Sequence, residues 1–193
     1  MELFWRRGYD ASTLPELQAA MGNISPPSFY AAFGSKEKVF ADAVALYRAE
    51  VACDGARALA QGATAKESIA GLIRESLKMF TGSPTQRGCL FILGAVNSTN
   101  PAAESLLREQ RRQGLEMIRG RIRRGIVDGD VPKTADAETI ATFYATVLNG
   151  LAFAANDGVP TSSLRRVAES ALEAWDGLVA AKKPPRRTSG SRA

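Results

Sequence analysis

Residues 13–40 read TLPELQAAMGNISPPSFYAAFGSKEKVF and carry the start and stop signals of consecutive short helices. Thr13 is followed three residues later by Glu16, which is the spacing of a capping box at a helix N-terminus. Gly22 can adopt the left-handed conformation that commonly ends a helix. Ser25 can cap the next helix, and the two prolines after it suit a first helical turn. The segment therefore predicts two short helices joined by a tight turn.

The second of these helices has one apolar face. Phe29 and Phe33 are four residues apart, so both are expected to face inward. Ser35 is a further candidate cap, for one long helix expected from Lys36 to about Asp54. A helix-turn-helix of this kind inserts its second helix into the major groove of DNA. The outward-facing residues of that helix are Pro27, Ser28, Tyr30 and Ala31.

The segment from Gly8 to Phe40 follows the pattern G-Y-D-A-S-T-L-P-E-L…M-G…S-F-Y-A-A-F-G-S-K-E-K-V-F. This pattern resembles the TetR family of bacterial transcriptional regulators. The family's first helix usually begins earlier in the chain, so Glu2–Arg7 is expected to be the end of a truncated helix. The resemblance implies phosphate contacts by Thr13, Tyr30 and Lys36, and base-facing positions at Ser25, Pro27, Ser28 and Ala31.

The formal net charge of +5 is unevenly distributed along the chain. Residues 1–50 hold five Lys/Arg and six Asp/Glu, whereas residues 182–193 hold five Lys/Arg and no acidic residue. The latter segment is expected to be a basic disordered tail. Neutralisation of DNA phosphates by basic residues supplies most non-specific DNA affinity. Because residues 1–50 have no excess of basic residues, the prediction of DNA binding rests on the motif alone. The alternative is a small-molecule-binding helical dimer whose shortened helix-turn-helix domain no longer binds DNA.

The remainder of the chain also reads as helices. Apolar residues recur at helical spacing in residues 66–80, 101–125 and 164–180, and no segment alternates convincingly with period two. The predicted fold is all-α, with a helix-turn-helix DNA-binding domain over residues 1–50. A helical bundle domain for ligand binding and dimerisation is expected over residues 51–181. The arginines between residues 108 and 124 are mixed with glutamates and predict a solvated helix face.

The segment from Thr139 to Asn156 is uncharged over eighteen residues. That length is near the lower limit for a membrane span, but the threonines and asparagines in it favour a helix buried against a partner subunit, so no membrane contact is expected. The family resemblance implies that this helix and residues 164–180 form a four-helix interface in a homodimer. The interface residues expected there are Phe143, Val147, Leu151, Leu164, Val167, Ala171, Leu172, Trp175 and Leu178.

The composition argues against catalysis. The chain has no histidine and two cysteines, which excludes the usual zinc sites and His-based acid–base catalysis. No glycine-rich loop follows a strand, so there is no nucleotide fingerprint. We therefore expect no enzyme activity, no metal and no cofactor. The absence of a secretory signal, together with two cysteines, favours the reducing cytoplasm.

Residues 88–98 are apolar and predict a buried helix, with a strand as the alternative, since periodicity alone does not separate the two. Cys89 stands at the expected start of this helix, after Arg87, where a thiolate would be stabilised. Cys89 is therefore a candidate redox sensor, and the alternative is a small buried core residue.

The family resemblance places an effector site inside the helical body. Its candidate residues are Phe80, Phe91, Asn97, Met117, Phe143, Tyr144 and Asn149, and for any single one of them plain core is the favoured alternative, because pockets and cores share their composition. This lining indicates a mainly apolar small molecule. The resemblance thus implies a ligand-responsive transcriptional regulator, most often a repressor in this family. It would bind palindromic double-stranded operator DNA as a homodimer and be released by the effector.

Overall fold

The computed structural model describes residues 1–180 of the chain. This part consists of helices joined by turns and loops and contains no strand, which confirms the all-α prediction. The basic tail expected over residues 182–193 lies outside the described residues. The helices are α1 (Glu2–Arg7), α2 (Leu14–Ala20), α3 (Pro26–Phe33), α4 (Lys36–Glu50), α5 (Cys53–Gln61), α6 (Ala65–Thr81), α7 (Leu90–Leu93), α8 (Pro101–Asp128), α9 (Ala137–Asn156), α10 (Thr161–Glu173) and α11 (Trp175–Ala180).

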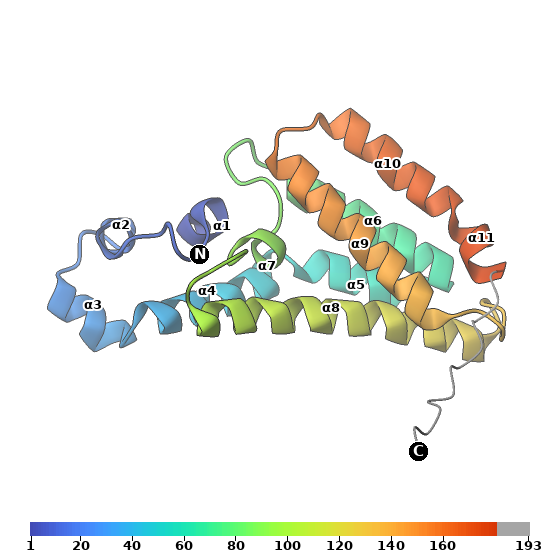
Figure 1. The fold of residues 1–193 in the computed structure, drawn as a ribbon, viewed down its shortest axis with the longest axis horizontal. Coiled ribbons are helices and arrows are strands. Elements are labelled where there is room, and N and C mark those ends of the chain that lie inside the picture. Colours follow the sequence, from blue (N-terminus) through green and yellow to red (C-terminus); the bar gives the residue numbers. More distant parts are fainter. Residues whose placement is uncertain (181–193) are drawn as a thin grey trace, which may run out of the picture.

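The helices form two groups along the long axis of the molecule (Figure 1). Helices α1, α2 and α3 lie at one end, with α3 outermost, and α4 leads from them into the larger group. Helix α8 runs the length of that larger group, with α5, α6 and α9 packed along it. Helix α10 packs on α9 and α6, on the side away from α8. The helix-turn-helix is therefore carried at the tip of the molecule.

The helix starts in the N-terminal group form as the sequence predicts. Thr13 Oγ1 accepts the Glu16 N–H at 3.4 Å, and Glu16 Oε2 accepts the Thr13 N–H at 3.0 Å, which completes the capping box. Ser25 Oγ accepts the Ser28 N–H at 3.3 Å at the start of α3. Ser35 caps α4 in the same manner. Each cap supplies an acceptor for an N–H that has no partner inside the helix.

The structure corrects the single long helix expected from Lys36 to about Asp54. Helix α4 ends at Glu50, and the N–H groups of Val51 and Ala52 both donate to the Tyr47 carbonyl, at 3.0 and 2.9 Å. A separate helix, α5, follows and packs against α6. Leu59 of α5 is almost fully buried there, so tertiary packing ends the longer helix.

Two further helices are shorter than expected. Within residues 88–98 only α7 is helical, because Gly88 and Asn97 adopt positive φ values of 80° and 55° at either side of it. The helix expected over residues 164–180 begins at Thr161 and is divided at Ala174 into α10 and α11. The segment preceding α7 is also fixed by Arg87, whose guanidinium donates to two carbonyls at the end of α9.

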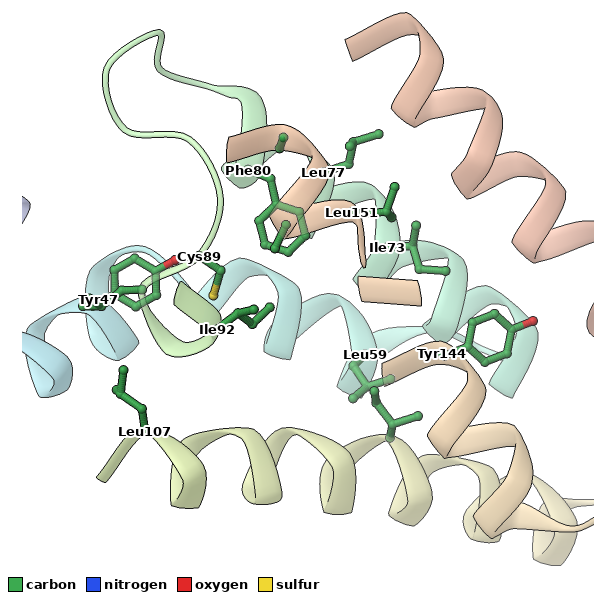
Figure 2. Close-up of a cluster of buried hydrophobic side chains, with 14 of the residues drawn as sticks. Tyr47, Leu59, Ile73, Leu77, Phe80, Cys89, Ile92, Leu107, Tyr144 and Leu151 are labelled. Carbon is green, nitrogen blue, oxygen red and sulfur yellow. The ribbon is translucent and has the colours of Figure 1, made fainter. Parts of the chain in front are cut away.

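Aromatic rings connect the core of the N-terminal helices to the larger group. Phe4 and Phe40 lie edge to face with ring centroids 5.0 Å apart. Trp5 packs in the same way on Tyr47 at 4.9 Å, and Tyr47 packs on Phe91 of α7 at 4.9 Å. The buried apolar side chains of α4 to α9 continue this core (Figure 2). Close packing of this kind transmits small displacements between the two groups.

No helix in residues 1–180 is long and apolar enough to cross a membrane. The described residues also contain no cluster of three or more His, Cys, Asp or Glu side chains that could hold a metal ion.

Candidate DNA-binding surface and effector cavity

The outer face of α3 is open to solvent. Phe29 is fully buried and anchors the helix, whereas Tyr30 is 52% exposed. Ser25 Oγ and Ser28 Oγ are 2.9 Å apart at the start of the helix, so the two hydroxyls form one exposed polar pair. The sequence-predicted base-facing residues, all of them exposed, are Ser25, Pro27, Ser28 and Ala31.

The three predicted phosphate-binding residues differ in accessibility. Thr13 and Tyr30 are exposed, but Lys36 is half-buried, with its Nζ 4.3 Å from the centroid of the Tyr9 ring. Burial lowers the pKa of Lys36, and the charges of Asp10 and Glu37 partly oppose that effect. The Lys36 ammonium is therefore held against an aromatic face, in a cation–π arrangement.

Lys38 is an exposed cation beside α3 that the sequence interpretation did not select. Its side chain passes over Gly34, where a β-carbon would lie 3.2 Å from Lys38 Nζ. Gly34 has a φ of 76°, which favours glycine, and this turn directs Lys38 towards the C-terminal end of α3. The sequence did indicate this second cation, because the SKEK run of residues 35–38 contains a lysine two residues after Lys36.

A cavity of about 290 Å³ lies inside the larger group, between α4, α5, α6, α7, α8 and α9. Its volume is at the small end of the range for ligand pockets. Of the seven residues predicted for the effector site, four line this cavity: Phe80, Phe91, Met117 and Asn149.

The other three predicted effector residues lie elsewhere. Asn97 is exposed in the turn that follows α7. Tyr144 is fully buried, and its hydroxyl donates to the Ala171 carbonyl at 3.2 Å. Phe143 packs edge to face on Tyr144, whose ring also contacts Trp175. Phe143 and Tyr144 thus serve the packing between α9 and the C-terminal helices, and the cavity takes its lining from a different part of α9.

Cys89 is buried on the cavity wall, directly before α7. Figure 2 shows it beside Tyr47 of α4. Burial raises the pKa of the Cys89 thiol, and a hydrogen bond with the Tyr47 hydroxyl opposes that shift only in part. The burial of Cys89 thus favours the thiol over the thiolate, contrary to the sequence-based prediction. The reason is that Arg87 is bound to carbonyls of α9 and α7 has only one turn.

Charged and amide side chains form the polar part of the cavity lining, and of these only Asn149 was predicted from the sequence. Arg48 of α4 donates through Nη2 to Gln113 Oε1 at 2.7 Å and also to Gln110 Oε1. Arg111 of α8 donates through Nη1 to the Phe91 carbonyl at 2.7 Å. Both contacts join α8 to another helix of the cavity wall. The sequence did contain a signal for them, because residues 110, 111 and 113 lie about one helical turn from apolar residues of α8 and so share part of its inward face.

The arginines of α8 only partly form the solvated face that their sequence predicts. Arg108 and Arg112 are exposed and pair with glutamates of the same helix. Arg121 instead is 7% exposed, donating to Ser68 Oγ at 2.7 Å and to the Gly62 carbonyl. Arg111, as described above, lines the cavity.

Several residues expected in the dimer interface are already buried within the subunit. Helices α9 and α10 pack on each other and on α6. The expected interface residues that are buried within the subunit are Leu151, Leu164, Ala171 and Trp175. Val167 is 53% exposed, and four others are half-buried, namely Phe143, Val147, Leu172 and Leu178. Phe153 of α9, which was not predicted, is 43% exposed. An apolar surface therefore remains on these helices.

Comparisons with known families agree with this geometry. Residues 1–43 match the model for bacterial regulatory proteins of the tetR family. Residues 65–170 match the model for the tetracyclin repressor-like C-terminal domain. The chain belongs to the TetR family of bacterial transcriptional regulators, a family of DNA-binding proteins and not of enzymes.

Individual relatives support the same assignment. The chain is 43% identical to a cysteine mutant of the TetR family transcriptional regulator CifR, whose structure was solved in complex with 26-bp double-strand operator DNA. That match covers 90% of this chain and 92% of the other, with a TM-score of 0.84. The HTH-type transcriptional repressor ComR of Escherichia coli (strain K12) is 24% identical, over 93% of this chain and 86% of ComR. BdcR, also an HTH-type transcriptional repressor of that strain, is 27% identical, over 89% and 83%.

Proposed function

We propose that this DNA-binding regulator is a repressor that occupies a palindromic operator as a homodimer. A small effector bound in the cavity releases it. The exposed face of α3 is the observation that carries the proposal, because it offers solvent-accessible polar and aromatic groups at the tip of the molecule (Figure 1). The relative solved with operator DNA supports it. We assign DNA binding to residues 1–50, effector binding and dimerisation to residues 51–181, and the site of action to the cytoplasm.

The DNA contacts divide into two kinds. Base contacts specify the sequence, while phosphate contacts hold the protein in register. The exposed start of α3 suits the first kind, and the residues proposed for it are Ser25, Pro27, Ser28 and Ala31. The second kind falls to cationic and hydroxyl groups around α3, which are Thr13, Tyr30, Lys36 and the additional Lys38.

Dimerisation places two copies of α3 on one face of the DNA. Half-sites one helical turn apart, about 34–36 Å, require two readers related by a two-fold axis. The apolar surface on α9 and α10, which includes Val167 and Phe153, suits the contact between subunits. The residues already buried within the subunit support this surface from behind.

Effector binding acts on the distance between the two readers. The cavity is lined by α4, which continues directly from the helix-turn-helix, and by α7 and α8. An effector that favours a different position of α4 shifts the population away from the operator-binding spacing. Near-complete release requires a preference of about 5.5 kcal/mol between the two arrangements.

A gel-shift assay with DNA from beside the gene tests the proposal. Wild-type protein should retard one fragment specifically, and Tyr30→Phe should weaken binding to a similar degree on all sequences. Ser28→Ala should instead change the preference between operator variants. Equal, sequence-independent losses from both variants would refute the division of roles.

The N-terminal charge favours one alternative function. Residues 1–50 carry one more acidic than basic residue, which is unusual for a DNA-binding surface. The alternative is a small-molecule-binding helical dimer that no longer holds DNA. A stable dimer that shifts no fragment, at low salt and without effector, would establish this alternative.

Cys89 gives the same cavity a second way to control DNA binding, through chemical modification of its thiol. Since its thiol lies on the cavity wall, an oxidant or electrophile must enter the cavity to reach it. We propose that modification of Cys89 releases the operator. The proposal fails if Cys89→Ser leaves both operator affinity and the response to oxidants unchanged.

A further inference from the structure

We propose that the effector is an amphipathic molecule with one carboxylate, which binds between Arg48 and Arg111 while its apolar part fills the rest of the cavity. The inference rests on the proposed function, because it assumes that the cavity is the effector site. It goes further by assigning a charge and a head-group geometry to a ligand that the sequence predicts only as mainly apolar.

The first observation is the lack of a counter-ion for either guanidinium. Among residues 1–180, the ion pairs include neither Arg48 nor Arg111. The hydrogen-bond acceptors that they contact are neutral: two glutamine amides for Arg48 and one backbone carbonyl for Arg111. A guanidinium has five N–H donors, so each retains donors for a ligand.

The second observation is that nearby carboxylates are already engaged. Glu75 is the one acidic residue in the cavity lining, and its two oxygens accept from Lys78 Nζ at 2.8 and 3.0 Å. Glu109 lies one turn from Gln113 on α8, and it accepts from Arg112 and Gln113. Neither cavity arginine therefore has a carboxylate in direct contact, and the charges of Glu109 and Glu104 act on Arg48 and Arg111 only from beyond ion-pair distance.

The third observation is the contrast between this polar end and the remaining wall. Most of the lining is apolar, including Leu72, Met79, Phe80, Ile92, Leu115 and Ile118. Burial lowers the pKa of Arg111, which reflects the cost of holding its charge in this environment. An anionic ligand would remove that cost and gain charge-assisted hydrogen bonds. A carboxylate fits best, because its two oxygens match the planar fork of a guanidinium.

Arg87 and Arg121, which are both less exposed than Arg48, do not offer the same site. Arg87 donates to the Ala155 carbonyl in the last turn of α9, where the helix dipole favours a cation, and to the Val159 carbonyl in the loop that follows. Arg121 is enclosed by Ser68 and the Gly62 carbonyl and does not line the cavity. The proposed site is therefore specific to the two arginines that face the cavity.

The test measures ligand binding by calorimetry on the full chain without DNA. The probes are two matched pairs that differ only in the head group: octanoate against 1-octanol, and 3-phenylpropanoate against 3-phenylpropanol. In at least one pair the acid should bind about tenfold more tightly than the alcohol, which is the size expected for a charge-assisted contact. Arg111→Met and Arg48→Met should each reduce this advantage to about twofold or less.

Arg112→Met is the matched control, because Arg112 lies on the same helix but is exposed and paired with Glu109. It should keep the full preference for the acid. Circular dichroism of each variant verifies that the helical fold is retained. The proposal is overturned if neither acid binds more tightly than its alcohol, or if the preference survives both cavity substitutions. Operator binding is measured separately by gel shift, so a failure to bind DNA leaves this result interpretable.

Discussion

The Tyr9 hydroxyl donates to Glu37 Oε1 at 3.0 Å, which joins the turn after α1 to the first turn of α4. Asn100, the residue that caps α8, donates through Nδ2 to both groups, at 3.1 Å to Tyr9 and 2.9 Å to Glu37. The Tyr9 N–H also donates to the Gly94 carbonyl at 2.6 Å. The position of the helix-turn-helix is thus tied to the loop between α7 and α8, close to the cavity.

This cluster predicts an acid-dependent loss of stability. Hydrogen bonds from its own backbone N–H, Ser35 and Tyr9 lower the pKa of Glu37 to about 2 from an ordinary value of 4.5. A lowered carboxyl pKa stabilises the folded protein above about pH 4.5, and this stabilisation is lost as the pH falls towards 2. Glu37→Gln should therefore lower the melting temperature at pH 7 and have a smaller effect near pH 2.

Thermal unfolding followed by circular dichroism between pH 2 and 7 measures this difference. Glu50→Gln, which changes an exposed acidic residue at the other end of α4, is the matched control. A gap between wild type and Glu37→Gln that stays constant with pH would contradict the assignment.

Phe29 should control the stability of the helix-turn-helix. Its side chain is fully buried and contacts the rings of Tyr30 and Phe33. Phe29→Ala removes a buried ring and should cost about 3–5 kcal/mol of unfolding free energy. Urea denaturation gives this value directly. Ala31→Ser, an exposed change on the same helix, should fall within about 0.5 kcal/mol of wild type.

The two lysines near α3 should contribute differently to DNA binding. Lys38 is exposed, whereas the Lys36 ammonium rests on Tyr9 and must leave that ring to reach a phosphate. Each lysine that neutralises one phosphate contributes about one unit to the salt slope of binding. We expect Lys38→Ala to lower the magnitude of the slope by about one, and Lys36→Ala to lower it by less.

Operator affinity measured over a salt series tests this expectation. Lys78→Ala is a suitable control, because Lys78 is paired with Glu75 on α6, far along the chain from α3. An unchanged slope in Lys38→Ala would remove Lys38 from the DNA-binding surface.

Local signals explain what the sequence could predict about the fold. The caps at Thr13, Ser25 and Ser35 depend on hydrogen bonds to residues three positions ahead, so they are visible in a short window of sequence. The break after Glu50 has no such signal. It follows from the packing of α5 on α6, which is a contact between segments and so is not encoded in the local pattern.

The cavity shows the same division. Apolar character selected Phe80, Phe91 and Met117, which do line it. Arg111 was interpreted as part of a solvated face, because arginines mixed with glutamates usually are. Its contact with the Phe91 carbonyl depends on where α7 lies, and the length of α7 could not be predicted from an apolar run alone.

The apolar surface of α9 and α10 gives the most direct test of the dimer. Val167 is 53% exposed and Phe153 is 43% exposed, although both are large apolar residues on the helices proposed to meet across the two-fold axis. Val167→Glu would bury an unpaired carboxylate in the apolar contact twice, because the substitution occurs in both subunits. We expect this variant to be monomeric at micromolar concentration, as measured by light scattering after gel filtration.

Val127→Glu makes the same change at an 84% exposed position on α8 and should remain dimeric. Because two readers must bind together, operator affinity should fall with the loss of the dimer in Val167→Glu, while the helical content stays unchanged. A Val167→Glu dimer of wild-type strength would show that the subunits meet through another surface.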